Sequence, residues 1–482
     1  MGKRAKGLFW GGVAVFLFAA GIRFLTKLSD PGYAYSKNRD FIEHSDSYDV
    51  LFFGNSHMAN GVFPMELWND YGIVSYNLAG FGLPMPAIYW VMKNALDESE
   101  PALVIIDCYN LASEEKAGRK EMLHAQTDHL PLSFHKIQMI NDLIQEPGER
   151  LEFIWNFAAY HDRWWDLDQA DFEGKVNVQK GAEIAFDVVS PNKMAQRPEK
   201  TVEVDSVGVE YLRRMIEECQ NRNIEVMLTY LPFPASEEDW EEALYVEDIA
   251  REYEVSYINF LDLSVVDLAV DCSDKNSHLN GSGGRKVTAY IGKYIDEHYN
   301  IADHRGEGAY AGWEEDYRQY TRYKLDVMAQ TETLDKYLMM LADPAFDCCI
   351  YVDGEAGIWR QNEMYMPLVE NIAGERTEKL SQAVTSGGDY FLMVDNKRRG
   401  LNENVDGKQF SIETSFGNVH YGMDEKGNRT LFLQDGETDY FLKTSQGNNV
   451  AVQIVVINSA DGSIAGIKRF GSGLSVYTQG DS

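Results

Sequence analysis

Short, continuous apolar runs alternate with amphipathic segments between residues 48 and 297. Continuous runs of this length are typical of strands buried on both faces of a parallel sheet, and the segments between them have helical spacing. The alternation therefore predicts an α/β domain, with helices on both faces of a parallel sheet. The expected strands are residues 48–53, 74–78, 102–107, 224–230 and 255–260, and the expected helices are 86–99, 207–221, 237–253 and one after Gly281.

The pattern changes twice outside this alternation. Residues 110–205 interrupt it, and we expect a largely helical insertion there. Aromatic and apolar residues recur at helical spacing over 311–341, which predicts one long linking helix at 311–342. Residues 343–482 contain short β-like runs separated by Gly, Asn and Asp turns, which indicates an all-β accessory domain of sandwich or barrel type. The 482 residues exceed one compact core, so two folded domains at 30–304 and 343–482 are expected.

The most apolar segment is at the N-terminus. Sixteen consecutive apolar residues run from Gly7 to Ile22, and residues 1–28 carry five Lys or Arg and no acid. This pattern predicts an uncleaved transmembrane signal-anchor at 7–26, with residues 1–6 cytoplasmic and the remainder exported. A cleaved signal peptide is the main alternative, because the apolar run is short, and a buried core helix is a weaker one.

Composition excludes several functional classes. Lys+Arg number 44 against 76 Asp+Glu, so the net charge is −32, and binding to nucleic-acid phosphates is not expected. The five cysteines form no C-x-x-C pair, which argues against a zinc ribbon or a disulfide scaffold. His57, His161 and His278 lack metal-ligand spacing, so a metal hydrolase is a poor candidate. We expect neither a metal nor another cofactor.

The first candidate chemical group follows the first expected strand. Ligands of open α/β sheets bind beyond the carboxyl ends of the strands, and Gly54-Asn-Ser56-His57 lies there. Ser56 is therefore a candidate nucleophile, with helix N-terminal amides available to an oxyanion. The alternative is an ordinary turn in which Asn55 or Ser56 caps the helix. His57 is a candidate substrate contact, or a histidine that only packs.

The second candidate group follows the fifth expected strand and opens the last helix. A serine hydroxyl needs a base to take its proton, and the base works best when a carboxylate fixes its tautomer. His278 supplies the base from the same edge of the sheet as Ser56, and either Asp274 or Asp271 could supply the carboxylate. Serine catalysis is favoured over a histidine that merely caps a helix, because the two groups follow the first and last strands.

Residues 48–297 resemble the SGNH (GDSL-type) esterase and acetyltransferase family, in particular its membrane-anchored members that work with polytopic O-acyltransferases on cell-surface polysaccharides. The matching blocks are 54–57, 76–82 and 274–280. The resemblance implies a three-layer, flavodoxin-like domain with Ser56 as nucleophile, His278 as base and Asp274 as orienter. It also implies the backbone amides of Ser56 and Gly80 as oxyanion donors.

This sequence departs from the family pattern in two places. The family has Asp-x-x-His, whereas Asp274 is four residues before His278, so Asp271 or a Ser–His dyad stays open. The Gly-x-Asn-Asp block is not visible, and Asn110 is its nearest substitute as a third oxyanion donor. Arg163 and Trp164 are candidate sugar-binding residues, although a packed aromatic corner with an Arg ion pair is the favoured explanation. Residues 448–470 resemble the lectin-like domain of the interleukin-like EMT inducer family, which implies carbohydrate binding.

The sequence thus predicts a single-pass membrane protein whose outer part is a serine acetyltransferase or acetylesterase for cell-envelope polysaccharide, acting through an acyl-enzyme. A cell-surface glycan and a polytopic membrane O-acyltransferase are the expected partners. The main alternative is a catalytically inactive SGNH-type glycan-binding or scaffold protein. A lipase or a secreted peptidase with the same serine chemistry is also possible, because fold and triad do not name the substrate.

Overall fold

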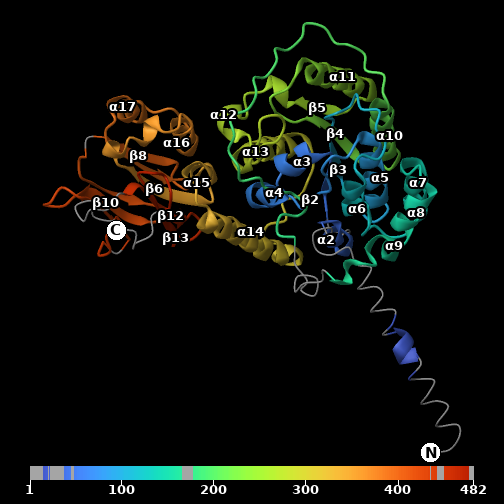
Figure 1. The fold of residues 1–482 in the computed structure, drawn as a ribbon, viewed down its shortest axis with the longest axis horizontal. Helices are drawn as coiled ribbons and strands as arrows, with labels where there is room; N and C mark the ends of the chain where they lie inside the picture. The colour runs from blue at the N-terminus through green and yellow to red at the C-terminus, as the bar shows by residue number, and fades with distance from the viewer. Residues whose placement is uncertain are drawn as a thin grey trace, which may run out of the picture.

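The computed structural model describes residues 13, 15–19, 21, 37–44, 48–165, 177–405, 407–434, 436–441 and 450–476. Figure 1 shows a larger body that contains the helices up to α13 and a smaller body that contains β6 and the later strands. The helix α14 (Ala311–Gln330) runs between them.

The larger body contains a five-stranded parallel sheet in the order β2-β1-β3-β4-β5. The strands are β1 (Val50–Phe53), β2 (Ser75–Asn77), β3 (Leu103–Asp107), β4 (Glu225–Tyr230) and β5 (Ser256–Asn259). This is the doubly wound order of flavodoxin-like sheets, and it reverses between β1 and β3. Ligands of such sheets bind beyond the carboxyl ends of the strands at the point of reversal, which is where β1 ends.

Helices cover both faces of this sheet because successive strand residues point to opposite sides. Leu51 and Phe53 pack in one core with α5 (Met85–Ala95), α10 (Val207–Asn221) and α11 (Glu237–Tyr253). Val50 and Phe52 pack in a second core with α3 (Ser56–Gly61) and α13 (Gly281–His298). The continuous apolar runs are explained by this burial on both faces. Outside the insertion after β3, the other elements before α13 are α2 (Lys37–Glu43), α4 (Pro64–Tyr71), η5 (Phe260–Asp262) and α12 (Leu268–Asp271).

In the described residues of the insertion after β3, the helices lie between Lys120 and Trp165. Its helices are α6 (Lys120–Thr127), α7 (Phe134–Leu143), α8 (Pro147–Ile154), α9 (Asn156–Tyr160) and the short η3 (Arg163–Trp165). Residues 177–205 contain turns but neither helix nor strand. Their backbone groups bond instead to loops of the sheet domain, as in Gly281 N to Ala185 O (2.8 Å) and Val189 N to Cys272 O (3.0 Å). These tertiary bonds replace the internal bonds of a helix.

The linking segment is two helices rather than one. After η6 (Gly308–Tyr310), α14 ends at Gln330, and α15 (Leu334–Leu341) begins after three intervening residues. Thr331 has an extended backbone at ψ 124°, and its hydroxyl donates to Val327 O at 2.9 Å. Side-chain bonding of this kind competes with helix continuation, and the apolar spacing alone does not reveal it.

The smaller body is not all-β, which corrects the expected fold class. Its five-stranded antiparallel sheet has the order β13-β12-β6-β7-β8, and its three-stranded sheet has the order β11-β10-β9. Helices α16 (Tyr365–Ala373) and α17 (Glu378–Ser386) and the short helices η7 (Gly354–Ala356) and η8 (Ile358–Arg360) lie between β6 and β7. The strands are β6 (Phe346–Val352), β7 (Tyr390–Asp395), β8 (Gly400–Asn404), β9 (Phe410–Thr414), β10 (Gly417–Met423), β11 (Arg429–Leu433), β12 (Val450–Asn458) and β13 (Ile464–Gly471).

The two faces of β6 explain why helices are needed there. Cys348, Ile350 and Val352 pack in one core with α15, α16 and α17. Cys349 and Tyr351 pack in a second core with residues of the three-stranded sheet. A strand buried on both faces needs a cover on each side, and here one cover is helical.

The expected transmembrane helix is the second correction to the fold class. Within the residues that the structure describes, no helix combines the length and the apolar character that a membrane crossing requires. This finding contradicts both the predicted span at 7–26 and the single-pass membrane location that followed from it. Most of residues 7–26, and all of residues 1–6, lie outside the described residues.

Candidate functional site

Ser56 occupies the first position of α3, immediately beyond β1. Asn55 caps this helix, because its side-chain oxygen accepts a hydrogen bond from the backbone N–H of His57 at 3.0 Å. Gly54 is required by packing, since a Cβ atom there would lie 2.8 Å from Met58 Cβ and 3.0 Å from Asp107 Cβ. The close approach of helix and strand therefore fixes where the serine hydroxyl emerges.

A second loop reaches the same edge of the sheet just before α13. Cys272 and Leu279 form an isolated antiparallel bridge, and Ser273 N donates to His278 O at 2.8 Å. Asn280 caps α13 by accepting from the N–H groups of Ser282 (3.1 Å) and Gly283 (3.2 Å). The loop from 273 to 278 is thus closed at its base, and its side chains are presented from a fixed turn.

The two loops bring three side chains into a chain of hydrogen bonds. His278 Nε2 lies 2.8 Å from Ser56 Oγ, and His278 Nδ1 is hydrogen-bonded to the Asp274 carboxylate. The second oxygen of that carboxylate accepts from the backbone N–H groups of Asn276 and Ser277, both at 2.8 Å. This tight turn folds Asp274 back onto the ring, so the four-residue spacing still places the carboxylate beside His278.

The electrostatic setting of Asp274 favours its charged form. Burial by itself raises the pKa of this carboxyl, but the backbone N–H groups of Asn276 and Ser277 and the His278 ring hold the pKa below its usual range. An ionised carboxylate on Nδ1 stabilises the tautomer that leaves Nε2 free to accept a proton from Ser56. The hydroxyl of Ser277, 3.1 Å from Nδ1, is a further neighbour of the ring that the sequence did not indicate.

Asp271, the alternative orienter, is engaged elsewhere. Its side chain is fully buried, and it pairs with Lys286 Nζ at 2.6 Å and accepts from Ser282 Oγ at 2.8 Å. It also accepts from the backbone N–H of Asp267 at 2.8 Å. These contacts anchor the start of α13, whereas Asp274 alone of the two candidates is hydrogen-bonded to the His278 ring.

The expected oxyanion donors are placed unequally. Ser56 N–H lies at the start of α3, before the first helical bond, which runs from Ala59 N to Asn55 O. Gly80 N–H donates to Gly54 O at 3.1 Å. Asn110 is exposed and has a left-handed backbone at φ 64°, and the described residues show no hydrogen bond from its side chain to Ser56 or His278.

His57 is enclosed by aromatic rings beside the serine. It is 3% exposed, it stacks on Tyr109 with ring centroids 3.8 Å apart, and it meets Phe233 edge-on at 4.6 Å. Both ring nitrogens are buried and lack a hydrogen-bond partner among the described residues. Burial, followed by the charge of His278, lowers the pKa of His57 to about 3, so the ring is neutral. Tyr109 lies two residues beyond the end of β3, a position that the sequence could have indicated.

The remaining candidates lie apart from this group. Arg163 begins η3, two residues separate it from the end of α9, and Figure 1 shows α9 well separated from α3 and α13. The side chain of Trp164 lies outside the described residues. The structure instead brings the segment 177–205 to the loop that carries Asp274 and His278, since Asn192 N donates to Lys275 O at 2.8 Å and Asn192 Nδ2 to Asn276 Oδ1 at 2.7 Å. No periodicity in the sequence indicates this contact.

The described part of the chain contains no group of three or more His, Cys, Asp or Glu arranged to hold a metal ion.

Comparisons with known proteins add little. No protein-family model matches the chain, and no curated protein matches it. Among solved structures, a candidate acylhydrolase from Bacteroides fragilis NCTC 9343 is similar with a TM-score of 0.28 and 12% sequence identity, covering 54% of this chain and 94% of that chain.

Proposed function

We propose that the protein is a serine-dependent acyl-ester hydrolase or acyltransferase with Ser56 as nucleophile, His278 as base and Asp274 as orienter. The observation that supports this function is the 2.8 Å contact between Ser56 Oγ and His278 Nε2, with the Asp274 carboxylate on Nδ1. The order of nucleophile, base and carboxylate is the arrangement that activates a hydroxyl.

The reaction begins when Ser56 Oγ attacks the ester carbonyl and His278 Nε2 takes the hydroxyl proton. The tetrahedral intermediate then collapses, the C–O bond to the alcohol breaks, and the leaving oxygen receives that proton from Nε2. Water or a second hydroxyl attacks the acyl-enzyme by the same route in reverse, which restores Ser56. Throughout, His278 Nδ1–H donates to Asp274, which stabilises the imidazolium when it forms.

The Ser56 N–H is proposed as the first oxyanion donor, because it precedes the hydrogen-bonded part of α3. Gly80 N–H would become the second only by exchanging the Gly54 carbonyl for the substrate oxygen. Asn110 stays a prediction as the third donor.

Within this reaction class we propose an O-acetyl ester on a polysaccharide as the substrate. The side chains of His278 and Asp274 are 27% and 40% exposed, so the reacting group lies near the surface. An ester on a bulky polymer can reach such a site, whereas a lipid chain favours an enclosed apolar channel. The polytopic acyltransferase partner stays a prediction, and so do the sugar-binding roles of Arg163 and Trp164.

A non-catalytic scaffold is the second candidate function. It is favoured by one observation, the hydrogen bond from Gly80 N–H to Gly54 O, which occupies an expected oxyanion donor. A bound glycan without turnover would be its signature.

One experiment separates the two candidates. The purified full chain is treated with a fluorophosphonate probe and assayed with p-nitrophenyl acetate. We expect labelling at Ser56 and turnover that Ser56→Ala and His278→Ala each reduce by at least about 10³-fold. Ser411→Ala, an exposed serine on β9, is the control and should retain both signals. A wild-type chain that is folded but neither labelled nor active would reject the hydrolase and favour the scaffold.

A further inference from the structure

A cleft of about 510 Å³ lies where the two bodies meet α14. Its walls come from the end of α4, from α13 and α14, and from the residues that flank β6 and β12. This volume is in the range of pockets that hold small organic ligands. None of the residues that line it belongs to the Ser56 loop or the His278 loop, so it is a separate place on the molecule.

The side chains around this cleft are enriched in positive charge. Arg285, Arg318, Arg322 and Lys397 line it, and among the lining residues Asp70 is the one acid. The whole chain has 76 acidic residues and 44 basic residues. Four cations around one cavity are therefore an unusual concentration of positive charge for this chain. Clustered cations in a cleft raise the local concentration of anions.

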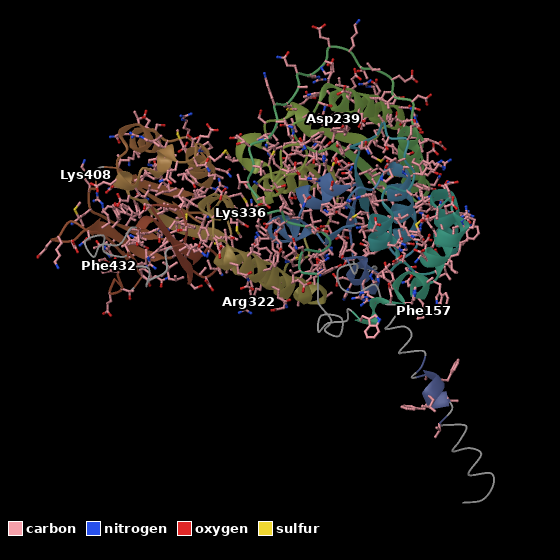
Figure 2. The ribbon with its side chains drawn as sticks, in the orientation of Figure 1. Phe157, Asp239, Arg322, Lys336, Lys408 and Phe432 are labelled. Carbon is pink, nitrogen blue, oxygen red and sulfur yellow. The ribbon has the colours of Figure 1, made fainter. Side chains whose placement is uncertain are left out.

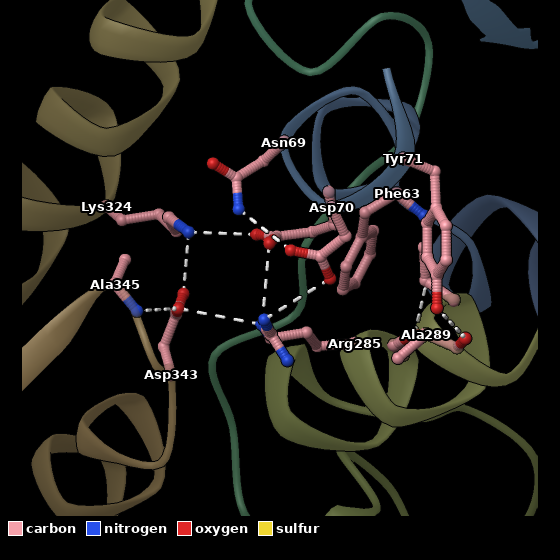
Figure 3. Close-up of polar contacts among 12 residues, drawn as sticks. Phe63, Asn69, Asp70, Tyr71, Arg285, Ala289, Lys324, Asp343 and Ala345 are labelled. Atoms are coloured by element: carbon pink, nitrogen blue, oxygen red, sulfur yellow. Dashed lines mark hydrogen bonds and ion pairs between the residues drawn. The ribbon is translucent and has the colours of Figure 1, made fainter. Parts of the chain in front are cut away.

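The acids near the cleft form ion pairs mainly with Arg285 and Lys324. Arg285 Nε lies 3.4 Å from Glu66 and 3.7 Å from Asp343, and Arg285 Nη2 lies 3.7 Å from Asp70 (Figure 3). Lys324 pairs with Glu66 and Asp343 from the other side. Arg285 is therefore already balanced by carboxylates, and it does not count as an available cation.

Three further cations line the cleft, and none of them is paired with the acids that contact Arg285 and Lys324. Arg318 is paired with Glu315, one turn earlier on α14, but its side chain is 67% exposed. Arg322 is exposed, and no hydrogen bond or ion pair of its side chain is found within the described residues. Lys397 is exposed, its Nζ donates to Ala460 O at 2.8 Å, and its charge contributes to lowering the pKa of the nearby Asp461 carboxyl, whose main causes are hydrogen bonds from Ser463.

The apolar part of the cleft lining suits an organic molecule rather than a bare ion. Tyr317, Leu325, Pro344 and Ala345 line it together with the polar Asn458. Thr321 also belongs to the lining. A ring or short carbon chain can cover the apolar atoms of this lining.

We propose that this cleft is a binding site for a small organic anion, whose carboxylate or phosphate group is held by Arg318 and Arg322 with help from Lys397. Two arginines one turn apart on α14 can present their planar guanidinium groups to one oxyanion. Charge-assisted bonds of this type give both affinity and orientation. The inference does not depend on the proposed esterase chemistry, because no lining residue takes part in it.

The test measures binding to the full chain by calorimetry at low ionic strength. The probes are D-glucuronate and D-glucose 6-phosphate, which fit the cavity volume, and neutral methyl glucoside controls for the sugar ring. We expect one or both anions to bind and the neutral sugar to bind at least 10-fold more weakly. Affinity should fall as salt is added. The carboxylate and phosphate arms show which oxyanion the site selects.

Matched variants assign the binding to the cleft. Arg318→Gln combined with Arg322→Gln should weaken anion binding at least 10-fold. Arg251→Gln is the control, because Arg251 is 68% exposed and paired with a glutamate one turn earlier on α11, like Arg318 on α14. Ser56→Ala should bind normally. If neither anion binds better than the neutral sugar, or if the double variant binds as tightly as the Arg251 variant, the proposal is wrong.

Discussion

Lys324 Nζ lies 2.9 Å from Glu66 Oε1, and neither side chain is more than 5% exposed. The same Nζ lies 2.6 Å from Asp343 Oδ2, so one cation joins α4 of the larger body to the start of the smaller body (Figure 3). Burial alone would lower the pKa of Lys324, but the two carboxylates raise it above its ordinary value. Lys324 is therefore charged, and it holds two buried acids at the junction of the bodies.

We expect Lys324→Met to lower the free energy of unfolding by about 3–5 kcal/mol, because it leaves buried carboxylates without their main partner. The measurement is urea unfolding of the full chain, followed by tryptophan fluorescence. Lys293→Met is the matched control, since Lys293 is 68% exposed and 3.7 Å from Glu297, and its loss should cost less than about 1 kcal/mol. Equal effects of the two substitutions would contradict a structural role for the buried cation.

The parallel strands were predictable because strands buried on both faces consist of continuous apolar runs. The runs at 48–53 and 102–107 contain β1 and β3, which are buried at every position. The extended segment 177–205 was not predictable, because it forms hydrogen bonds with distant parts of the chain, such as the one that Gly281 N–H donates to Ala185 O. The break between α14 and α15 depends on the Thr331 hydroxyl, and apolar spacing does not report such a bond.

The sequence predicted which loops form the site, but it did not predict the individual hydrogen bonds within it. Ser56 and His278 could be paired because each follows a strand of the same parallel sheet. The choice between Asp274 and Asp271 depends on how one short turn closes, since two backbone N–H groups draw Asp274 toward the ring. The engagement of Gly80 N–H by Gly54 O is a close tertiary contact, and no sequence pattern encodes it.

Asp274→Asn should mainly lower kcat, whereas Asp271→Asn should mainly lower the free energy of unfolding. If Asp274 orients His278, its substitution lowers kcat about 10²–10⁴-fold with little change in stability, because the ring loses its fixed tautomer. Asp271→Asn should lower the free energy of unfolding by about 3 kcal/mol, because it leaves Lys286 without its buried partner. Esterase kinetics and urea unfolding of both variants make the comparison. A loss of kcat in folded Asp271→Asn that equals the loss in Asp274→Asn would reassign the orienter.

His57→Phe should change the response of the protein to acid. The pKa of His57 is lowered to about 3 in the fold, so between pH 6.5 and 3 the unfolded chain binds a proton that the folded chain does not. This histidine therefore costs stability progressively as pH falls below 6.5. Phenylalanine keeps the stacking on Tyr109 and removes two unpartnered nitrogens, so the variant should be as stable as the wild type at pH 7 and lose less on acidification. Urea midpoints at pH 7 and pH 4.5 test this, and identical losses in both proteins would contradict it.

Asp107, at the end of β3, should lower the stability of the fold as pH rises, whereas His57 lowers it as pH falls. It is fully buried, its Oδ1 accepts from Leu231 N at 3.0 Å, and its Oδ2 has no partner in the described structure. Burial raises the pKa of Asp107 to about 7. Between about pH 4 and pH 7 the folded chain therefore holds a proton that the unfolded chain has released, so stability falls as pH rises through this window.

Asp107→Asn keeps the acceptor for Leu231 N and removes the titration. We expect the variant to lose less stability than the wild type between pH 4.5 and pH 7.5, by a difference of up to about 1.4 kcal/mol per pH unit. Urea unfolding across this range measures the slope for each protein, and the His57→Phe variant serves as a control because its effect has the opposite sign. Parallel slopes for the wild type and Asp107→Asn would show that Asp107 is already ionised in the fold, and that solvent or a partner group reaches Oδ2.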